Sequence, residues 1–188
     1  MIEKISRIIS YKLLLFRNAD EISNDDLDIL QYGLECIINT LIPIIIFLIV
    51  AFHQHMIFDL VLWLITFLIT RNYIGGYHAR THLRCIFIST ITGLASLFFI
   101  QYHKTFSVIQ ITIITVVILV IIFIWGPIVH DPSVCEQSNL KSKAIKAILF
   151  SYFFALCFSA FAPKYATSIT LGLLSSFLLY LIKRIRDM

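Results

Sequence analysis

Six long apolar segments, separated by short polar connectors, constrain this chain more than any other feature of its sequence. They lie at approximately 33–52, 57–74, 84–101, 106–125, 146–162 and 166–182. A helix that spans the hydrocarbon core of a bilayer needs about 20 apolar residues, and these segments come near that length. Within lipid, a helix satisfies its backbone hydrogen bonds internally. The sequence therefore predicts an all-α integral membrane protein with six transmembrane helices.

The composition agrees with this fold class. The chain has 188 residues, of which 59% are hydrophobic and only 14% are charged. A soluble domain would carry about 25% charged residues. Too few polar residues remain for a separate soluble module, so we expect one membrane domain over 1–188. It would consist of a charged leader at 1–32 and a six-helix bundle at 33–182.

Residues 1–17 have the pattern of an amphipathic helix. Their apolar side chains share one helical face, and cations occur in the same stretch: Ile2, Ile5, Ile8, Ile9, Leu13 and Phe16, with Lys4, Arg7, Lys12 and Arg17. Such a helix lies on a membrane surface, where its cations suit anionic lipid. An ordinary packing helix would show a similar pattern, so both interpretations stay open.

The lysines and arginines are distributed unevenly among the connectors. If the N-terminus is cytoplasmic, thirteen of the fifteen lie inside. The two that fall outside are Lys104 and Lys164. Cytoplasmic loops of membrane proteins carry an excess of lysine and arginine. The sequence therefore predicts that both termini, and the connector at 71–85, face the cytoplasm.

The connector at 71–85 gathers chemically active side chains between two apolar segments. It combines three arginines, two histidines and a cysteine with the adjacent glycines Gly75 and Gly76. An ionisable group costs about 3 kcal/mol at the centre of a bilayer, and such groups within membrane segments usually serve a function. The cluster therefore indicates a functional site held at the membrane surface.

His78 and Cys85 are the central pair of this cluster. The thiolate is the nucleophilic form of cysteine, and a neighbouring imidazole or cation lowers the pKa of a thiol. On an unbroken helix the two residues would lie about 10 Å apart along the axis, too far for a hydrogen bond. A catalytic pair therefore requires a break, which Gly75-Gly76 could supply. The alternative is a loop cysteine without a role and a histidine that reaches the lipid headgroups.

Two arginines flank this pair, and two acids lie in or near the membrane segments. Arg71 and Arg84 could stabilise a thiolate or a developing oxyanion, because guanidinium groups do so in dry sites. Both could equally be interfacial anchors. Glu35 and Asp59 could orient a histidine or close an interhelical ion pair, and the sequence does not choose between these roles.

The other cysteines and histidines compete less well. The four cysteines have unrelated spacings and form no CxxC pair, so we expect neither a metal nor a cofactor. Cys135 is a rival nucleophile to Cys85, but its acidic neighbours make its setting less electropositive. Cys36 and Cys157 lie within apolar segments and are expected to be small buried hydrophobes. His82 is a rival base.

The run Arg71…Gly75-Gly76-Tyr77-His78-Ala79…Cys85, after the second of six apolar segments, resembles the AgrB peptidases of Gram-positive quorum sensing. The resemblance covers nearly the whole chain, including the charged leader and a proline-containing basic loop at 126–145. In that family the residues that match His78 and Cys85 form the catalytic pair. The positions of Arg71 and Gly76 are functionally important there as well.

This resemblance implies a membrane-embedded cysteine endopeptidase that also allows a peptide ring to close. Its substrate would be an AgrD-like propeptide with an amphipathic leader, a central signal segment and an acidic C-terminal tail. The inside basic residues Arg80, Arg84, Lys141 and Lys143 would suit the acidic tail. The ring would be a thiolactone or a lactone.

The same resemblance implies where the protein works and with what. We expect it in the plasma membrane of a Gram-positive bacterium, as a multi-pass protein whose active site faces the cytoplasm. Its partners would be the propeptide, membrane lipids and, as a further option, a second copy of the chain in a homodimer. No nucleic acid is expected.

Two other classes of function were weighed against the peptidase. A small transporter or permease could use the polar residues at 71–85 as a translocation site, but it would be expected to carry ionisable residues near helix midpoints. The apolar segments offer almost none. A structural membrane-assembly protein would leave the glycine, histidine and cysteine cluster without a purpose.

The uneven distribution of cations makes the topology testable. In single-cysteine variants, residues 75–85 and 131–143 should be labelled from the cytoplasmic side, and residues 53–55 and 103–104 from the outside. The measurement is labelling of intact cells by a membrane-impermeant maleimide, before and after permeabilisation. Cytoplasmic labelling at 53–55 would contradict the assignment.

Overall fold

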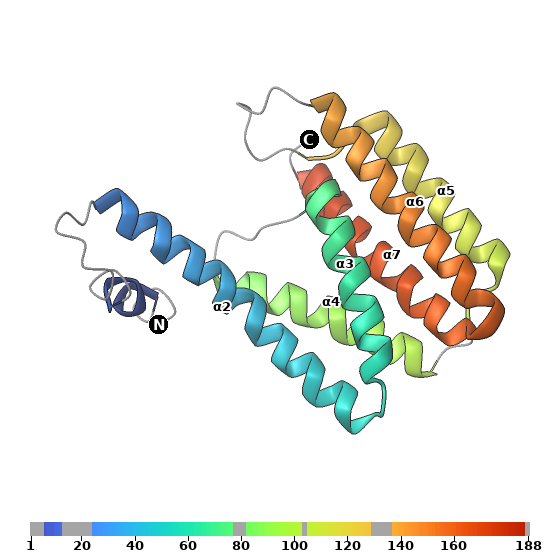
Figure 1. Ribbon diagram of the computed structural model, residues 1–188, viewed down its shortest axis with the longest axis horizontal. Coiled ribbons are helices and arrows are strands. Elements are labelled where there is room, and N and C mark those ends of the chain that lie inside the picture. The colour runs from blue at the N-terminus through green and yellow to red at the C-terminus, as the bar shows by residue number, and fades with distance from the viewer. Residues whose placement is uncertain (1–5, 13–23, 77–81, 103–104, 129–136, 187–188) are drawn as a thin grey trace. The chain divides into compact units, whose positions relative to one another are not determined.

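The computed structural model describes residues 6–12, 24–76, 82–102, 105–128 and 137–186, and every regular element in these ranges is a helix (Figure 1). A short helix occupies 6–12. The six long helices are α2 (Asn24–His53), α3 (Ile57–Ile74), α4 (His82–Tyr102), α5 (Val108–Trp125), α6 (Gln137–Phe161) and α7 (Pro163–Arg186). Each is long and apolar enough to span a membrane. The predicted all-α, multi-pass membrane fold is therefore confirmed, and the orientation of the termini stays a prediction.

Several helices extend beyond the apolar segments from which they were predicted. α2 begins at Asn24 instead of 33, so the last part of the charged leader expected at 1–32 is helical. α6 begins at Gln137 instead of 146, and α7 begins at Pro163 instead of 166. Hydropathy marks only the part of a helix that suits hydrocarbon, whereas backbone hydrogen bonding continues into polar turns. Proline suits the first turn of α7, because its missing N–H would have no helical partner there.

The described helices group into two compact units, and α2 and α4 each contribute to both. The first unit consists of Met1–Phe47 and Ala79–Ile91, and the second of Leu48–His78 and Thr92–Met188. The single membrane domain predicted over 1–188 stays a prediction.

In the first unit, the helix at 6–12 packs against α2 through small polar side chains. Ser6 and Ser10 are fully buried, and the Ser6 hydroxyl donates to the Glu35 carboxylate at 3.0 Å. Gln31 donates to the same carboxylate oxygen at 2.9 Å. Ile8 on this helix stays 58% exposed. The contact with α2 therefore includes buried polar side chains, while an apolar side chain of the same helix stays exposed. The rest of the predicted amphipathic stretch, 1–5 and 13–17, lies outside the described residues.

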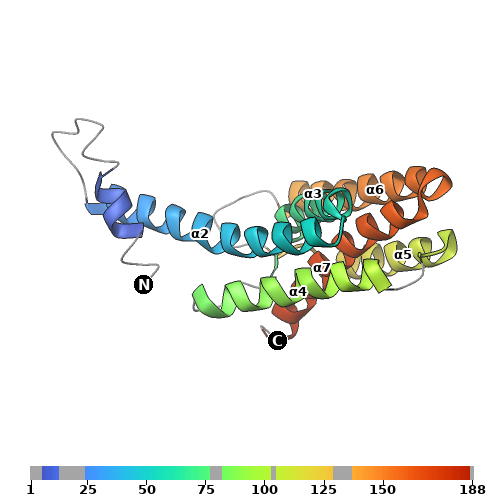
Figure 2. The same ribbon diagram turned by 90° about the horizontal axis from the view of Figure 1, so that it is seen from below.

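In the second unit, α7 is the buried helix around which α3, α5 and α6 are arranged (Figures 1 and 2). In the most apolar 18-residue stretch of α7, 72% of the residues are buried. The corresponding share is 39% in α3 and 22% in α5. Residues of α7 and of the neighbouring helices form two apolar clusters. The first contains Ile74, Ile118, Ile122, Ala144, Ile148, Leu173, Phe177 and Tyr180, and the second contains Leu62, Ile111, Ala155, Ala166 and Ile169. α7 therefore forms the core of this unit along most of its length.

α3 and α7 approach closely at Gly172. A Cβ atom at this glycine would lie 2.7 Å from the Trp63 carbonyl oxygen and 3.0 Å from the Thr66 Cβ. The two backbones can be this close only because position 172 has no side chain. Small residues are typical of helix contacts in membranes, where packing and hydrogen bonds replace the hydrophobic driving force.

Buried hydroxyls on α7 add hydrogen bonds along the same interface. Ser176 shares a hydrogen bond with Thr70 of α3 at 2.7 Å. Ser168 donates to Asp59 at 2.8 Å, and the Lys164 ammonium lies 3.2 Å from the other Asp59 carboxylate oxygen. Asp59 is only 3% exposed. Of the two roles left open for Asp59, the structure shows the interhelical ion pair.

The contact at Gly172 predicts a specific loss of stability. Gly172→Ala should destabilise the protein by about 2 kcal/mol, because backbone atoms of α3 would have to move to admit the methyl group. Gly33→Ala is the matched control, since a Cβ at this helical glycine would meet no atom within 4 Å. The measurement is thermal unfolding of the detergent-solubilised protein. Equal midpoints for the two variants would contradict this account of the α3–α7 contact.

Candidate active site

The turn at Gly75-Gly76 ends α3 in a conformation that glycine alone adopts readily. Gly75 has φ 79° and ψ −177°, and its N–H donates to the Arg71 carbonyl at 3.0 Å. Residues with side chains are almost absent from this backbone region. The predicted helix break at Gly75-Gly76 is therefore confirmed. α3 ends at Ile74, and the next described helix, α4, begins at His82.

Gly76 makes room for the side chain of Arg71. Gly76 is buried, and a Cβ atom on it would overlap Nη1 of the Arg71 guanidinium. The Arg71 Cζ lies 5.7 Å from the centroid of the Phe67 ring, one turn earlier on α3. The guanidinium is therefore held between an aromatic face and the backbone of the turn. Arg71 is half-buried at this turn.

A second glycine turn, at the end of α5, joins the first. Gly126 caps α5 with φ 71° and ψ 169°, and its N–H donates to the Ile122 carbonyl at 2.9 Å. Two residues later, the Ile128 N–H donates to the Ile74 carbonyl at 3.0 Å. A Cβ on Gly75 would lie 2.6 Å from the Ile128 carbonyl oxygen. The two turns are thus in backbone contact, and a side chain at position 75 would separate them.

The C-terminal part of α7 contacts the second turn through two side chains. The Tyr180 hydroxyl donates to the Gly126 carbonyl at 2.7 Å, and Arg184 Nη2 donates to the Trp125 carbonyl at 3.2 Å. These carbonyls lie at the end of α5, where a helix leaves its last C=O groups without helical partners. Sequence reasoning missed the role of Tyr180. The available signal was the four-residue spacing of Tyr180 and Arg184, which places both on one face of α7.

The lysines predicted to bind an acidic tail lie near the start of α6. The Lys141 ammonium is 4.3 Å from the centroid of the Phe123 ring on α5, and Lys143 is exposed. The N-terminal end of α6 lies beside the C-terminal ends of α3, α5 and α7 (Figure 1). Lys141, Arg71 and Arg184 therefore come from three helices that meet at one end of the second unit.

Cys85 belongs to the first unit and lies in the first turn of α4. It is half-buried, and the preceding Arg84 is exposed. The N-terminal end of a helix carries partial positive charge and favours an anion nearby. Cys36 and Cys157 are exposed on their helices, so their expected burial was wrong. Lipid is as apolar as a protein core, and an apolar segment therefore does not reveal which face is buried.

Several predicted site residues lie outside the described residues. His78 and Arg80 fall between α3 and α4, and the rival nucleophile Cys135 falls between α5 and α6. The side chain of His82 is also not described. The pairing of His78 with Cys85 therefore stays a prediction. Among the described residues, no group of three or more histidine, cysteine or acidic side chains is placed to hold a metal ion.

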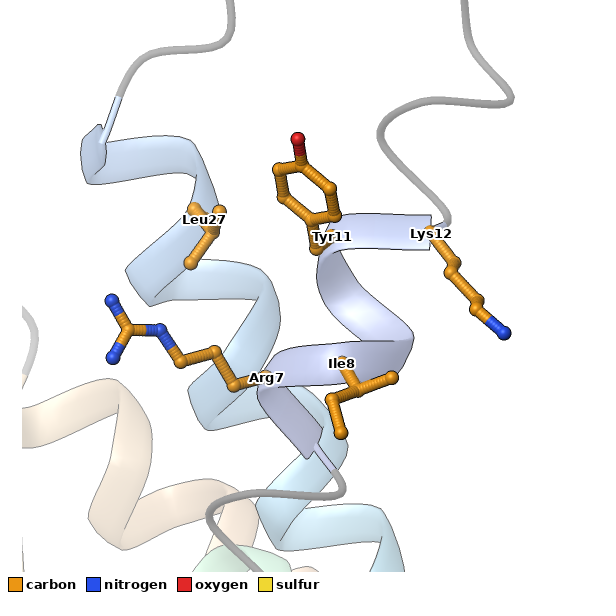
Figure 3. A pocket seen from close by; sticks show the side chains of 5 residues that line it. All are labelled: Arg7, Ile8, Tyr11, Lys12 and Leu27. Carbon is orange, nitrogen blue, oxygen red and sulfur yellow. The ribbon is translucent and has the colours of Figure 1, made fainter.

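A pocket of about 550 Å³ lies between the helix at 6–12 and α2 in the first unit (Figure 3). Its lining consists of Arg7, Ile8, Tyr11, Lys12 and Leu27. The Arg7 side chain extends toward α2, whereas that of Lys12 points away from it. The pocket is open, and it brings cations next to apolar side chains near the start of a spanning helix. This combination suits the interface of a membrane better than it suits a catalytic site.

Comparison with known proteins places this arrangement in a family. The sequence matches the family model of accessory gene regulator B, AgrB, over residues 3–182. Two AgrB-like proteins of Clostridium perfringens, from strains SM101 and 13, are each 32% identical over 126 residues. The match covers 67% of this chain and 56% of each relative, so the chain spans little more than half of their length. No solved structure matches.

The family match includes both glycine turns, Cys85 and the basic start of α6, and it confirms the resemblance seen in the sequence. Because the family model covers nearly all of its length, the chain belongs to the AgrB family.

Proposed function

We propose that this protein is a membrane-embedded cysteine endopeptidase, with Cys85 as nucleophile and His78 as acid–base group. Its substrate is a quorum-sensing propeptide, from which it removes the C-terminal tail. The position of Cys85 carries the proposal. Among the described cysteines, Cys36 and Cys157 are exposed on their helices, whereas Cys85 is half-buried in the first turn of α4, directly after Arg84.

In the proposed reaction, His78 takes the proton of the Cys85 thiol, and the thiolate attacks the carbonyl that joins signal and tail. The carbon–nitrogen bond then breaks, and His78 returns the proton to the amine of the departing tail. A thioester between the signal segment and Cys85 remains. Arg84 or Arg71 would stabilise the oxyanion that develops during the attack.

The thioester also accounts for ring closure. A cysteine or serine side chain in the signal segment attacks the thioester carbonyl, the bond to sulfur breaks, and the Cys85 thiol is regenerated. The product is a thiolactone or a lactone. The thioester conserves the energy of the acyl group, so cyclisation needs no ATP. The same cysteine therefore serves cleavage and cyclisation.

The basic end of the second unit supports recognition of an acidic tail. Lys141 and Lys143 lie near the first turns of α6, at the end where Arg71 and Arg184 also lie. Clustered charge of one sign raises the local concentration of an oppositely charged ligand. If this end faces the cytoplasm, as the distribution of cations predicts, the tail would bind on the side where the propeptide is made.

The transporter alternative has less support from the described residues. Their buried carboxylates are Asp59, near the start of α3, and Glu35, in the N-terminal third of its span. Asp59 is paired with Lys164, and Glu35 accepts hydrogen bonds from Ser6 and Gln31. A translocation pathway would be expected to place such groups near helix midpoints, facing a cavity.

The assignment of the nucleophile is tested by paired substitutions. Cys85→Ala should abolish cleavage and the covalent intermediate, whereas Cys135→Ala should stay within a few-fold of the wild type. His78→Ala should lose at least ~10²-fold in rate, the usual contribution of a positioned acid–base group, and His82→Ala much less. The assay is purified protein in vesicles with a synthetic propeptide, followed by intact-mass detection of the acyl-enzyme. An adduct on Cys135, or one that persists in Cys85→Ala, would refute the mechanism.

Recognition of the tail is tested by reversing one exposed charge. Lys143→Glu should raise KM roughly threefold, because an exposed charge pair contributes up to about 1 kcal/mol. Added salt should weaken binding by the wild type through screening. Lys143→Arg, which keeps the charge, should leave KM unchanged. Lys141 is less suitable for this test, since its substitution would also remove the contact with Phe123. If KM changes neither with the charge at position 143 nor with the salt concentration, the propeptide leader must provide the affinity.

A further inference from the structure

We propose that Tyr180 is a positioning residue, which braces the Gly75-Gly76 turn through the segment 125–128. The inference deepens the proposed function and rests on it in one respect: the turn precedes His78 by two residues, so its position would set that of the proposed acid–base group. All of the contacts that carry the inference lie within the second unit.

The brace begins on α7, where Tyr180 is completely buried. Its ring stacks on Phe177 at a centroid distance of 5.9 Å, and it belongs to the apolar cluster that also contains Ile74, Ile118 and Ile122. The ring is therefore fixed by packing. Its hydroxyl donates to the Gly126 carbonyl at 2.7 Å, a well-formed hydrogen bond to a group at the end of α5, where carbonyls lack helical partners.

The brace continues through the backbone between α5 and α3. Gly126 belongs to the segment 125–128, and two residues later the Ile128 N–H donates to the Ile74 carbonyl at 3.0 Å. The Ile128 carbonyl lies against Gly75, where a Cβ would be only 2.6 Å away. A shift of Gly126 would therefore be passed to the turn through a hydrogen bond and a close contact, with no long flexible side chain in between.

The last step leads from the turn to Arg71. The Arg71 side chain occupies the space next to Gly76, and its carbonyl accepts the N–H of Gly75. Movement of the turn would therefore also displace the guanidinium. One hydroxyl on α7 would thus act on Arg71 and, through the turn, on the proposed acid–base group.

The test compares two Tyr→Phe variants within the same unit. Tyr180→Phe keeps the ring and removes the hydroxyl that bonds to Gly126. Tyr152→Phe is the matched control, since its hydroxyl shares a hydrogen bond with Thr112 at 3.1 Å, also between two helices. Thr112 lies near the start of α5, roughly 20 Å along the helix from Gly126. Each variant loses one hydroxyl contact, so both should unfold at similar temperatures.

The first measurement is hydrogen–deuterium exchange in the full-length protein, which does not depend on activity. Tyr180→Phe should raise the exchange of the Gly75 and Ile128 amides at least tenfold, whereas Tyr152→Phe should leave both unchanged. Gly126→Ala offers a second route to the same effect. It strains the turn through its positive φ, while the added Cβ meets no atom within 4 Å. Unchanged exchange in Tyr180→Phe would overturn the brace.

The second measurement is single-turnover formation of the acyl-enzyme from a synthetic propeptide. Tyr180→Phe should lower this rate by about 10-fold to 100-fold with little change in KM, because a misplacement of about 1 Å can cost about 10²-fold. Tyr152→Phe should react like the wild type. Raised exchange with an unchanged rate would overturn the positioning role. If the wild type forms no acyl-enzyme, the proposed function fails, and the exchange experiment still decides whether the brace exists.

Discussion

The close approach of α7 to α3 at Gly172 is the contact on which the second unit depends. Hydrocarbon offers helices almost no hydrophobic reason to associate, so they must gain energy from packing and hydrogen bonds. With no side chain at position 172, the backbones come within van der Waals distance, and the flanking hydroxyls of Ser168 and Ser176 reach partners on α3. A larger residue at 172 would weaken the packing and lengthen both hydrogen bonds together.

The same packing holds the ends of α3 and α5 next to each other. α3 ends at the Gly75-Gly76 turn, and α5 ends at Gly126 with nearly the same backbone geometry. Each glycine satisfies a terminal carbonyl of its own helix, and the Ile128 N–H links the two turns. α7 is the most buried of the described spanning helices, and the Tyr180 hydroxyl connects it to the turn at the end of α5. The Gly75-Gly76 turn thus lies at one end of the second unit, in contact with the end of α5.

Positive charge at this end of the unit serves more than one purpose. Arg184 donates to the carbonyl of Trp125, and Lys141 lies over the ring of Phe123, so both are engaged in holding helices together. Lys143 is exposed. The described cations at this end of the second unit therefore include residues that pack between helices and one that is exposed to solvent. Charge counting alone treats them as equivalent.

The sequence by itself determined the features that depend on local composition. Hydropathy summed over about 20 residues located six spanning helices, Gly75-Gly76 marked the end of α3, and the motif from Arg71 to Cys85 indicated the family. The tertiary structure decided which faces and which distant residues meet. Asp59 pairs with Lys164, 105 residues later in the chain, and Tyr180 reaches Gly126, while Cys36 and Cys157 are exposed and not buried. In lipid the outer face of a helix is as apolar as its packed face, so hydropathy reveals that a helix spans the membrane without revealing what it touches.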